Sequence, residues 1–247
     1  MPIITLTTDF GTSDGYVGAM KGVLAARAGA AATIIDLAHD VPRHDIAHAA
    51  WIVATACTRF PAGTIHVVVV DPGVGGARRG VIVHAEGMWF VGPDNGVFAH
   101  LAPRRGRALL VPVDAAPTFH GRDVFAPAAA ALAIDELELA QLPWIDLAGT
   151  LPWGARPSGE GRVVHVDHYG NLVTDLPRVE AGAAIAIAGR RLTVTRTYED
   201  VARGELVAYV GSAGTIEIAV REGRADRVLD APRGTRVVPV AEEGGFR

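Results

Sequence analysis

The chain has 247 residues, of which 49% are hydrophobic and 20% are charged, with a formal net charge of −4. It is long enough for one large domain or two modest ones, and its mild acidity argues against nucleic acid or an anionic membrane as a partner. No apolar stretch reaches the roughly 20 residues of a membrane-spanning helix, and the first residues lack the pattern of a secretory signal. Cys57 is the single cysteine, which excludes an intrachain disulfide. We therefore expect a cytoplasmic protein in which Cys57 is a small core residue.

Strand and helix patterns alternate in the first part of the chain. Strands are predicted at residues 3–8, 33–37, 64–70, 81–85, 88–91 and 108–113, and helices near residues 17–29, 45–59 and 123–134. The apolar run from Val67 to Val70 does not alternate with polar residues, so both faces of its strand should be buried. The strands at 81–85 and 88–91 read as a hairpin around Glu86 and Gly87. This order predicts a mainly parallel sheet with helices on both faces.

The composition changes near residue 150, where a Pro- and Gly-rich segment, 151–161, reads as a linker. Helical patterns largely stop beyond it, and short strands are predicted at residues 162–167, 172–176, 183–187, 192–198, 206–210, 215–220 and 235–240. Seven short strands separated by Gly-containing turns are typical of a small β-barrel or sandwich. We therefore predict an α/β domain over residues 1–155 and a small all-β domain over residues 156–247.

Acidic side chains end two of the predicted buried strands, at Asp9 and at Asp71. Ligands of open parallel sheets bind beyond the carboxyl ends of the strands. Asp71 also opens a glycine-rich segment that ends at Arg78, which could bind a substrate carboxylate or simply neutralise Asp71 in a tight turn. On the residues alone these two interpretations have equal weight. The segment is neither a phosphate loop nor a dinucleotide fingerprint, because the required Gly-Lys-Ser/Thr and the third glycine are missing.

A second polar segment, Thr118 to Asp123, follows a strand and precedes a helix. This position suits His120 as a general base or a group that orients water. Alternatively, Asp123 caps the helix and His120 assists it. Capping by Asp123 is predicted in either case, with Pro127 in the first turn.

Histidine and aspartate gather between residues 39 and 48, which invites a metal interpretation: His39, Asp40, His44, Asp45 and His48. The spacing does not match His-Glu-x-x-His, and the other face of the predicted helix is apolar. A solvated helix start is therefore favoured over a metal site.

In the second domain, the turn from Asp167 to Asn171 joins two strands. It is either an ordinary β-turn with glycine in its usual place, or a nucleoside site. In the second case Asp167 and Asn171 offer hydrogen bonds and Tyr169 offers a stacking face. The polar turn at residues 211–214, followed by Glu217, gives a similar but weaker signal.

Taken together, these segments resemble the S-adenosylmethionine hydroxide adenosyltransferases, the hydrolase relatives of the fluorinase and chlorinase. The resemblance covers residues 3–223. The segments that carry it are Thr8–Gly11, Val69–Gly75 with Arg78, Gly92–Gly96, Phe119–Asp123, Asp167–Asn171 and Gly211–Ala219.

The resemblance implies an N-terminal α/β domain, a C-terminal β-barrel and a homotrimer whose ligand sites lie at subunit interfaces. It also implies a reaction, in which water attacks the ribose C5′ of S-adenosylmethionine and releases adenosine and methionine. No cofactor and no metal are implied, because S-adenosylmethionine is the substrate. The implied catalytic residues are Asp71, Arg78 and His120, and the implied substrate-binding residues are Asp9, Asn95, Thr118, Phe119, Asp167, Tyr169, Asn171, Ser212 and Glu217.

The resemblance also argues against halide as the nucleophile. In the halogenating relatives the position of Asp71 is not acidic, that of His120 is Tyr, and the first domain carries an inserted loop. A fixed carboxylate beside the nucleophile would repel halide. Three positions depart from the usual family pattern, which leaves details of the substrate open: His44, Asp175 and Arg221.

Two other functions compete with this interpretation. The first is a metal-dependent hydrolase that uses Asp9, Asp71 and either His39 or His120. The second is a non-catalytic module that binds adenosine or S-adenosylmethionine.

Overall fold

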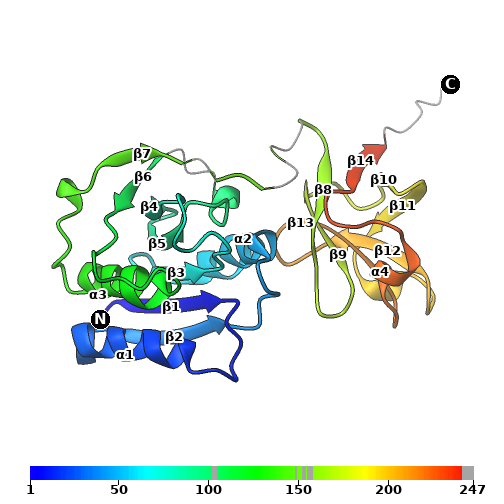
Figure 1. The fold of residues 1–247 in the computed structure, drawn as a ribbon. Coiled ribbons are helices and arrows are strands. Elements are labelled where there is room, and N and C mark those ends of the chain that lie inside the picture. The colour runs from blue at the N-terminus through cyan, green and yellow to red at the C-terminus, as the bar shows by residue number, and fades with distance from the viewer. Residues whose placement is uncertain (102–104, 148, 152–153, 155–157, 241–247) are drawn as a thin grey trace. The chain divides into compact units, whose positions relative to one another are not determined.

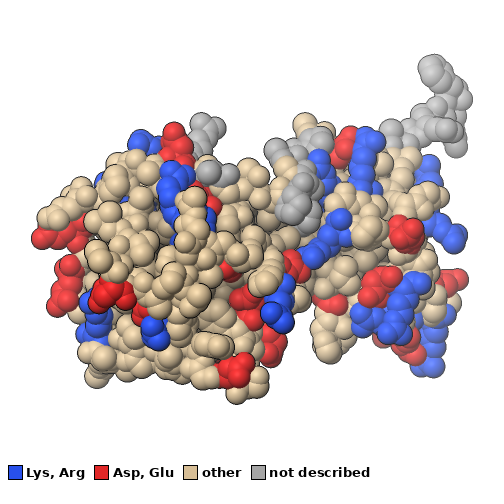
Figure 2. Space-filling view, in the orientation of Figure 1, with Lys and Arg blue, Asp and Glu red and all other residues tan. Residues whose placement is uncertain are grey.

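The computed structural model describes residues 1–101, 105–147, 149–151, 154 and 158–240. The chain forms two compact units, Met1–Pro152 and Trp153–Arg247 (Figure 1). The predicted domain boundary between residues 155 and 156 lies outside the described residues. In the part of the chain that is described, no helix is long and apolar enough to cross a membrane. On the face shown in Figure 2, acidic and basic side chains are interspersed.

The first unit contains a seven-stranded sheet with the order β2-β1-β3-β5-β4-β6-β7. Its strands are β1 (Ile3–Thr8), β2 (Thr33–Ala38), β3 (Ile65–Val69), β4 (Gly80–Ala85), β5 (Met88–Pro93), β6 (Arg105–Leu109) and β7 (Trp144–Asp146). Neighbours among β2, β1, β3 and β5 pair in parallel, whereas β4 pairs antiparallel with β5 and β6, and β6 with β7. The sheet is therefore mixed, and the prediction of a mainly parallel sheet is wrong.

The cause of the mixed pairing is the hairpin formed by β4 and β5, which the sequence predicts correctly. A two-residue turn forces its strands to be antiparallel, whereas parallel neighbours need a longer crossover. Helices separate β1, β2 and β3 in the chain, whereas β3, β4 and β5 follow one another without an intervening helix, and the antiparallel pairing begins there. Strand β6 begins three residues before the predicted start at residue 108, and β7 was not predicted.

Helices cover both faces of this sheet, as predicted (Figure 1): α1 (Tyr16–Ala28), α2 (Ile46–Thr55) and α3 (Ala126–Ala133). Val67 and Val69 of β3 pack on the side of α1 and α3, and Val68 and Val70 pack on the side of α2, so both faces of this strand are buried. Cys57 lies in the second of these cores, and burial raises the pKa of its thiol to about 12, which makes it unreactive. Short 3-10 helices span Gly29–Ala31, Cys57–Arg59, Ala99–Leu101 and Leu139–Gln141.

The second unit is a closed barrel with the strand order β10-β11-β12-β13-β9-β8-β14, which confirms the barrel prediction. Its strands are β8 (Gly161–Val166), β9 (Leu172–Pro177), β10 (Ala184–Ile187), β11 (Arg190–Thr195), β12 (Leu206–Val210), β13 (Thr215–Val220) and β14 (Arg236–Val240). Val163, Leu172, Ile185, Ile216 and Val237 are among the side chains that fill it. A 3-10 helix at Tyr198–Asp200 and a short helix, α4 (Ala225–Val228), were not predicted.

Candidate active site

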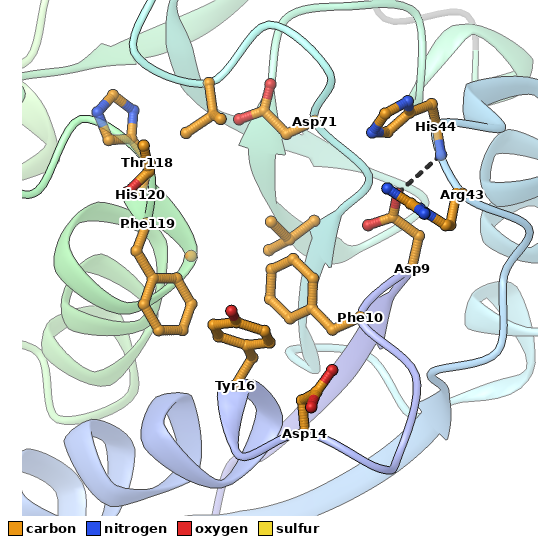
Figure 3. A pocket seen from close by; sticks show the side chains of 13 residues that line it. Asp9, Phe10, Asp14, Tyr16, Arg43, His44, Asp71, Thr118, Phe119 and His120 are labelled. Atoms are coloured by element: carbon orange, nitrogen blue, oxygen red, sulfur yellow. Dashed lines mark hydrogen bonds between the residues drawn. The ribbon is translucent and has the colours of Figure 1, made fainter.

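A pocket of about 480 Å³ lies beyond the ends of β1 and β3 (Figure 3). These strands pair with Thr8 opposite Val69, so the residues that follow them emerge at the same edge of the sheet. Asp9 and Asp71 therefore both reach the pocket, which is the position predicted from the carboxyl-end rule. The pocket is lined by Asp9, Phe10, Asp14, Tyr16, Arg43, His44, Val69, Asp71, Val74, Thr118, Phe119, His120 and Gly121.

Arg78 joins Asp71 and His120 into one hydrogen-bonded cluster. Its Nε donates to Asp71 Oδ1 at 2.9 Å, and its Nη2 donates both to Asp71 Oδ2 and, at 2.8 Å, to His120 Nδ1. The side chains of Asp71 and Arg78 are only 4% and 10% exposed. Burial strengthens this charge-assisted pairing, and the two-point contact fixes the orientation of the carboxylate.

The contact with Arg78 determines which tautomer His120 adopts. A guanidinium has no acceptor, so His120 Nδ1 must accept and, in the neutral ring, Nε2 carries the proton. Burial, followed by the charge of Arg78, holds the pKa of His120 below its ordinary value, while Asp71 and Asp123 act in the opposite direction. His120 is therefore a neutral hydrogen-bond donor at neutral pH.

Gly75 allows the loop after β3 to approach the segment before His120. It has a φ of +74°, and a Cβ atom there would lie 2.3 Å from the carbonyl oxygen of Pro117. Glycine is thus required both for its backbone conformation and for the space it leaves. Gly73 and Gly76 do not adopt positive φ, so the predicted freedom is used only at Gly75 within this segment.

Asn95 does not line the pocket but hydrogen-bonds to the residue that follows β3. Its Nδ2 donates to the carbonyl oxygen of Val70 at 2.9 Å, and its Oδ1 accepts from the backbone of Val97. In this structure Asn95 therefore fixes the residue that precedes Asp71.

Asp9 is held by a residue in an unusual backbone conformation. Its Oδ2 accepts from the backbone N–H of His44 at 2.8 Å, and His44 has a φ of +65° (Figure 3). Positive φ is uncommon for residues other than glycine and often marks a functional site. Arg43 and His44 face the pocket beside Asp9, so His44, one of the three positions that depart from the family pattern, lies at the site.

A hydrogen-bond chain that runs from buried Thr8 to exposed Lys21 supports the same loop. Thr8 Oγ1 lies 2.9 Å from His39 Nδ1, and His39 Nε2 lies 2.9 Å from Asp36 Oδ1. Lys21 in turn donates to Asp36 at 2.6 Å. Asp45 caps α2 by accepting from the backbone of His48, as the helix-start interpretation predicts. Within the described ranges, no group of three or more His, Cys, Asp and Glu side chains is arranged to hold a metal ion.

Aromatic rings form one wall of the pocket, and most of this wall was not predicted. Phe119 packs edge-on against Tyr16 and Phe10, with ring centroids 5.4 and 5.9 Å away. Thr118 also lines the pocket, and Asp14 adds a further carboxylate (Figure 3). Asp14 and Tyr16 follow β1 within a few residues, so the carboxyl-end rule could have found them.

Asp123 does not cap the helix, contrary to the prediction. His120 precedes a π-helix at Gly121–Phe125, which continues into α3 with Pro127 in its first turn. The carboxylate of Asp123 accepts instead from Arg122 and from the backbone of Ala116. The prediction failed because it assumed an α-helix that starts at Asp123, whereas the π-turn begins two residues earlier. Single π-turns are frequent at functional sites.

In the second unit, the turn from Asp167 to Asn171 is closed by its own side chains. Asp167 accepts from the backbone and from the Nδ2 of Asn171, both at 2.8 Å. Gly170 has a φ of +85°, and Tyr169 is 72% exposed. This turn borders a second pocket, of about 690 Å³, lined by Tyr169, Asn171, Tyr198, Glu199, Val220, Arg221, Glu222, Gly223 and Arg224.

The remaining predicted residues of this unit, Glu217 and Ser212, are not among the residues that line the second pocket. Glu217 does not line the second pocket, because its carboxylate accepts from Tyr209 at 2.8 Å. Ser212 is exposed in the turn between β12 and β13. Of the departures, Asp175 accepts from the backbone of Arg162, and Arg221 donates to the carbonyl oxygen of Val201.

Comparisons with known proteins match both units of the chain to one family. A family model described as the SAM hydroxide adenosyltransferase N-terminal domain matches residues 4–142, and the model of the C-terminal domain matches residues 161–238. The chain is 42% identical over 249 residues to the (R)-S-adenosyl-L-methionine hydrolase of Thermus thermophilus, a match that covers 93% of this chain and 96% of the relative. It is 37% identical over 266 residues to the protein of the same name from Salinispora tropica, with 96% and 97% covered.

A solved structure is also similar over nearly the whole chain. The crystal structure of a conserved hypothetical protein from Thermus thermophilus has a TM-score of 0.85 at 39% identity, and the match covers 97% of this chain and 100% of that one. Both units and the motifs that carry the resemblance lie within these matches. The chain therefore belongs to the SAM hydroxide adenosyltransferase family.

Proposed function

We propose that this enzyme hydrolyses S-adenosyl-L-methionine to adenosine and L-methionine by attack of water on the ribose C5′. The observation that carries the proposal is the buried cluster of Asp71, Arg78 and His120 at the edge of a pocket. The family and the names of the relatives support the same reaction.

The leaving group does not need a general acid. When the C5′–S bond breaks, its electron pair stays on sulfur, and the sulfonium becomes a neutral thioether that needs no proton. The enzyme must instead hold water in line with this bond, and alignment of reactants can contribute several kcal/mol. The new bond joins the water oxygen to C5′, and the proton that water loses must be accepted nearby.

The three catalytic residues divide this work. Asp71 accepts a hydrogen bond and then the proton from water, since each of its oxygens keeps a lone pair beside the contact with Arg78. Arg78 fixes the carboxylate in one orientation. His120 donates from Nε2 to the water oxygen and so orients the lone pair that attacks C5′.

The remaining site residues bind the substrate in this proposal. Asp9 accepts from the ribose hydroxyls, and Thr118 and Phe119 line the reacting end of the pocket. Asn95 holds the backbone of Val70, the residue before Asp71, and so acts on the site indirectly. The residues assigned to the adenine and methionine ends are Asp167, Tyr169, Asn171, Ser212 and Glu217. The family resemblance further suggests a homotrimer in which neighbouring subunits complete each site.

A turnover assay distinguishes this function from its two rivals. The protein is incubated with S-adenosyl-L-methionine and EDTA, and the products are identified by chromatography and mass spectrometry. The proposal predicts adenosine and methionine in equal amounts, with no need for added metal. Activity that EDTA abolishes and metal restores would support the metal-dependent hydrolase. Binding of substrate without any product would support the non-catalytic module.

A further inference from the structure

A line of hydrogen bonds in the barrel unit runs from a half-buried carboxylate to the second pocket. Tyr209 donates to Glu217 Oε2 at 2.8 Å, and the hydroxyls of Tyr209 and Tyr198 contact each other. Asn171 Nδ2 lies 3.4 Å from the hydroxyl of Tyr198 and 2.8 Å from Asp167 Oδ2. Tyr198 and Asn171 line the pocket, whereas Tyr209 and Glu217 lie behind them.

The number of protons on these groups fixes the direction of every bond. An ionised Glu217 can only accept, so it takes the single hydroxyl proton of Tyr209. Tyr209 must then accept from Tyr198, which in turn must accept from Asn171. The second proton of Asn171 Nδ2 goes to Asp167. The amide oxygen of Asn171 is thus the group that this side chain offers to a hydrogen-bond donor on a ligand.

The fold holds the carboxylate at the end of this line in place. Tyr209 and Glu217 face each other across the β12–β13 pair, and Tyr209 is 7% exposed. A Cβ atom at Gly211 would lie 1.9 Å from Glu217 Oε1, so the backbone of the next turn packs directly against the carboxylate. If Glu217 only filled space, neither the glycine at position 211 nor the hydrogen bond from Tyr209 would be required.

We propose that Tyr209 and Glu217 are positioning residues for the nucleoside end of the substrate. The ionised Glu217 orders the donors of Tyr209 and Tyr198, and these hold the ring of Tyr198 and the amide of Asn171 in one orientation. Neither positioning residue touches the substrate. This role rests on the proposed function, and it replaces the direct contact predicted for Glu217.

The arrangement makes substrate affinity sensitive to the protonation of Glu217. A carboxyl protonated on Oε2, the oxygen in contact with Tyr209, donates to Tyr209, which reverses the line and directs a hydroxyl proton of Tyr198 against the amide protons of Asn171. Among the described residues, the titratable groups that act on Glu217 are Tyr209 and Asp167, with Tyr198 in contact with Tyr209. Burial, followed by the charge of Asp167, raises the pKa of Glu217, and the hydrogen bond from Tyr209 lowers it. Affinity should therefore fall on acidification, beginning at a higher pH than for an ordinary glutamate.

The experiment uses the full chain and measures kcat and KM for S-adenosyl-L-methionine, with the dissociation constant of adenosine by calorimetry, from pH 8 down to pH 5. Tyr209→Phe should raise KM and the dissociation constant about tenfold, the effect of about 1.4 kcal/mol, and change kcat less than about twofold. Glu217→Gln keeps an acceptor that cannot titrate, so it should retain affinity at pH 8 and lose the weakening at low pH. Glu180→Gln, an exposed carboxylate of the same unit, is the control.

The outcomes separate this inference from the proposed function. Unchanged affinity in Tyr209→Phe, or a wild-type pH dependence of affinity in Glu217→Gln, would overturn the positioning role even if the enzyme turns over normally. If the wild type forms no adenosine but its adenosine affinity follows the predicted pattern, the proposed function fails and the positioning role stands. Circular dichroism of each variant verifies that it is folded.

Discussion

Arg78 contacts both Asp71 and His120 and so links the loop after β3 to the segment before the π-helix. It neutralises Asp71 through two donors, as a tight turn would, and it also holds His120. The residue types predict the first contact, since a carboxylate and a guanidinium seven positions apart can meet across a glycine-rich loop. The second contact depends on the approach at Pro117, which no local pattern encodes.

Asp71→Asn tests the proton acceptor at the scale of a single atom. Asparagine keeps the size and one acceptor oxygen, but it cannot take the proton that water loses. We expect kcat to fall by about 10²–10⁴-fold, the usual contribution of a general base, with a smaller change in KM. Steady-state kinetics measure this. Asp146→Asn, at an exposed ion pair with Arg105, is the control and should leave kcat unchanged. Wild-type kcat in Asp71→Asn would remove Asp71 from the mechanism.

The pH profile of kcat tests the state of His120. Protonation of its Nδ1 would place an N–H against the donor of Arg78, so only the neutral ring fits the cluster. Because burial and the charge of Arg78 hold the pKa of His120 below 6.5, the active form persists into mild acid. We expect an acid limb in kcat with its midpoint below that value.

The same shift has a consequence for folding. Below the ordinary pKa of histidine the unfolded chain binds the proton more readily than the folded chain, so His120 makes the fold less stable as the pH falls.

The control for the pH profile of kcat is His84→Gln, at an exposed position, which should leave the acid limb in place. A kcat that rises on acidification, or a midpoint above 6.5, would contradict the assignment of a neutral donor. Protonation of Glu217 can be distinguished from that of His120, because it should change KM rather than kcat.

At the scale of elements, Gly75→Ala tests whether the loop after β3 must touch the segment before the π-helix. The methyl group would collide with the carbonyl oxygen of Pro117 and separate Arg78 from His120. Gly63→Ala is a matched control, since Gly63 has a φ of +82° with nothing within 4 Å of its Cβ position. Both variants carry the strain of positive φ, about 1–2 kcal/mol, which denaturant unfolding measures. Only Gly75→Ala should also lose most of its kcat. Equal activity in the two would show that the approach is unimportant.

Most elements of the fold could be predicted from local patterns, and the failures have a common cause. Strand β1 and the barrel strands β12 and β13 have the predicted bounds, because their β-branched runs end at glycine or a polar turn. The prediction of a mainly parallel sheet failed beyond β3, because the direction of pairing depends on which strands become neighbours. The alternation of helix and strand stops at β3, which β4 follows without an intervening helix. The line from Glu217 to Asn171 was missed for a similar reason, since it joins two strand residues to a 3-10 helix and a turn.

For the whole molecule, the proposed trimer makes a prediction about mixed subunits. Asp71→Asn disables the first unit and Asn171→Ala the second, and each variant alone should have little activity. If neighbouring subunits complete each site, co-expression should restore activity at about a quarter of the sites, because each site draws its two halves at random from different chains. The native mass should be three times the 25.8 kDa of one chain. No recovery in a mixed trimer would place each complete site within one chain.

The sequence alone identified as candidate site residues two carboxylates at strand ends, the histidine before the π-helix and the turn in the barrel. Their assignment to one reaction came from the order of the motifs, because neither unit alone contains all the proposed residues. Arg43 was missed because arginine is common in ordinary loops, and only the folded chain brings it to the pocket.

The origin of the new oxygen in adenosine tests the central claim most directly. The enzyme is incubated with S-adenosyl-L-methionine and EDTA in ¹⁸O-labelled water, and the adenosine formed is analysed by mass spectrometry with fragmentation. Attack of water on C5′ predicts a single heavy oxygen in the 5′-hydroxyl group and none in methionine. Unlabelled adenosine, label in methionine, or substrate that remains intact would contradict the proposed reaction.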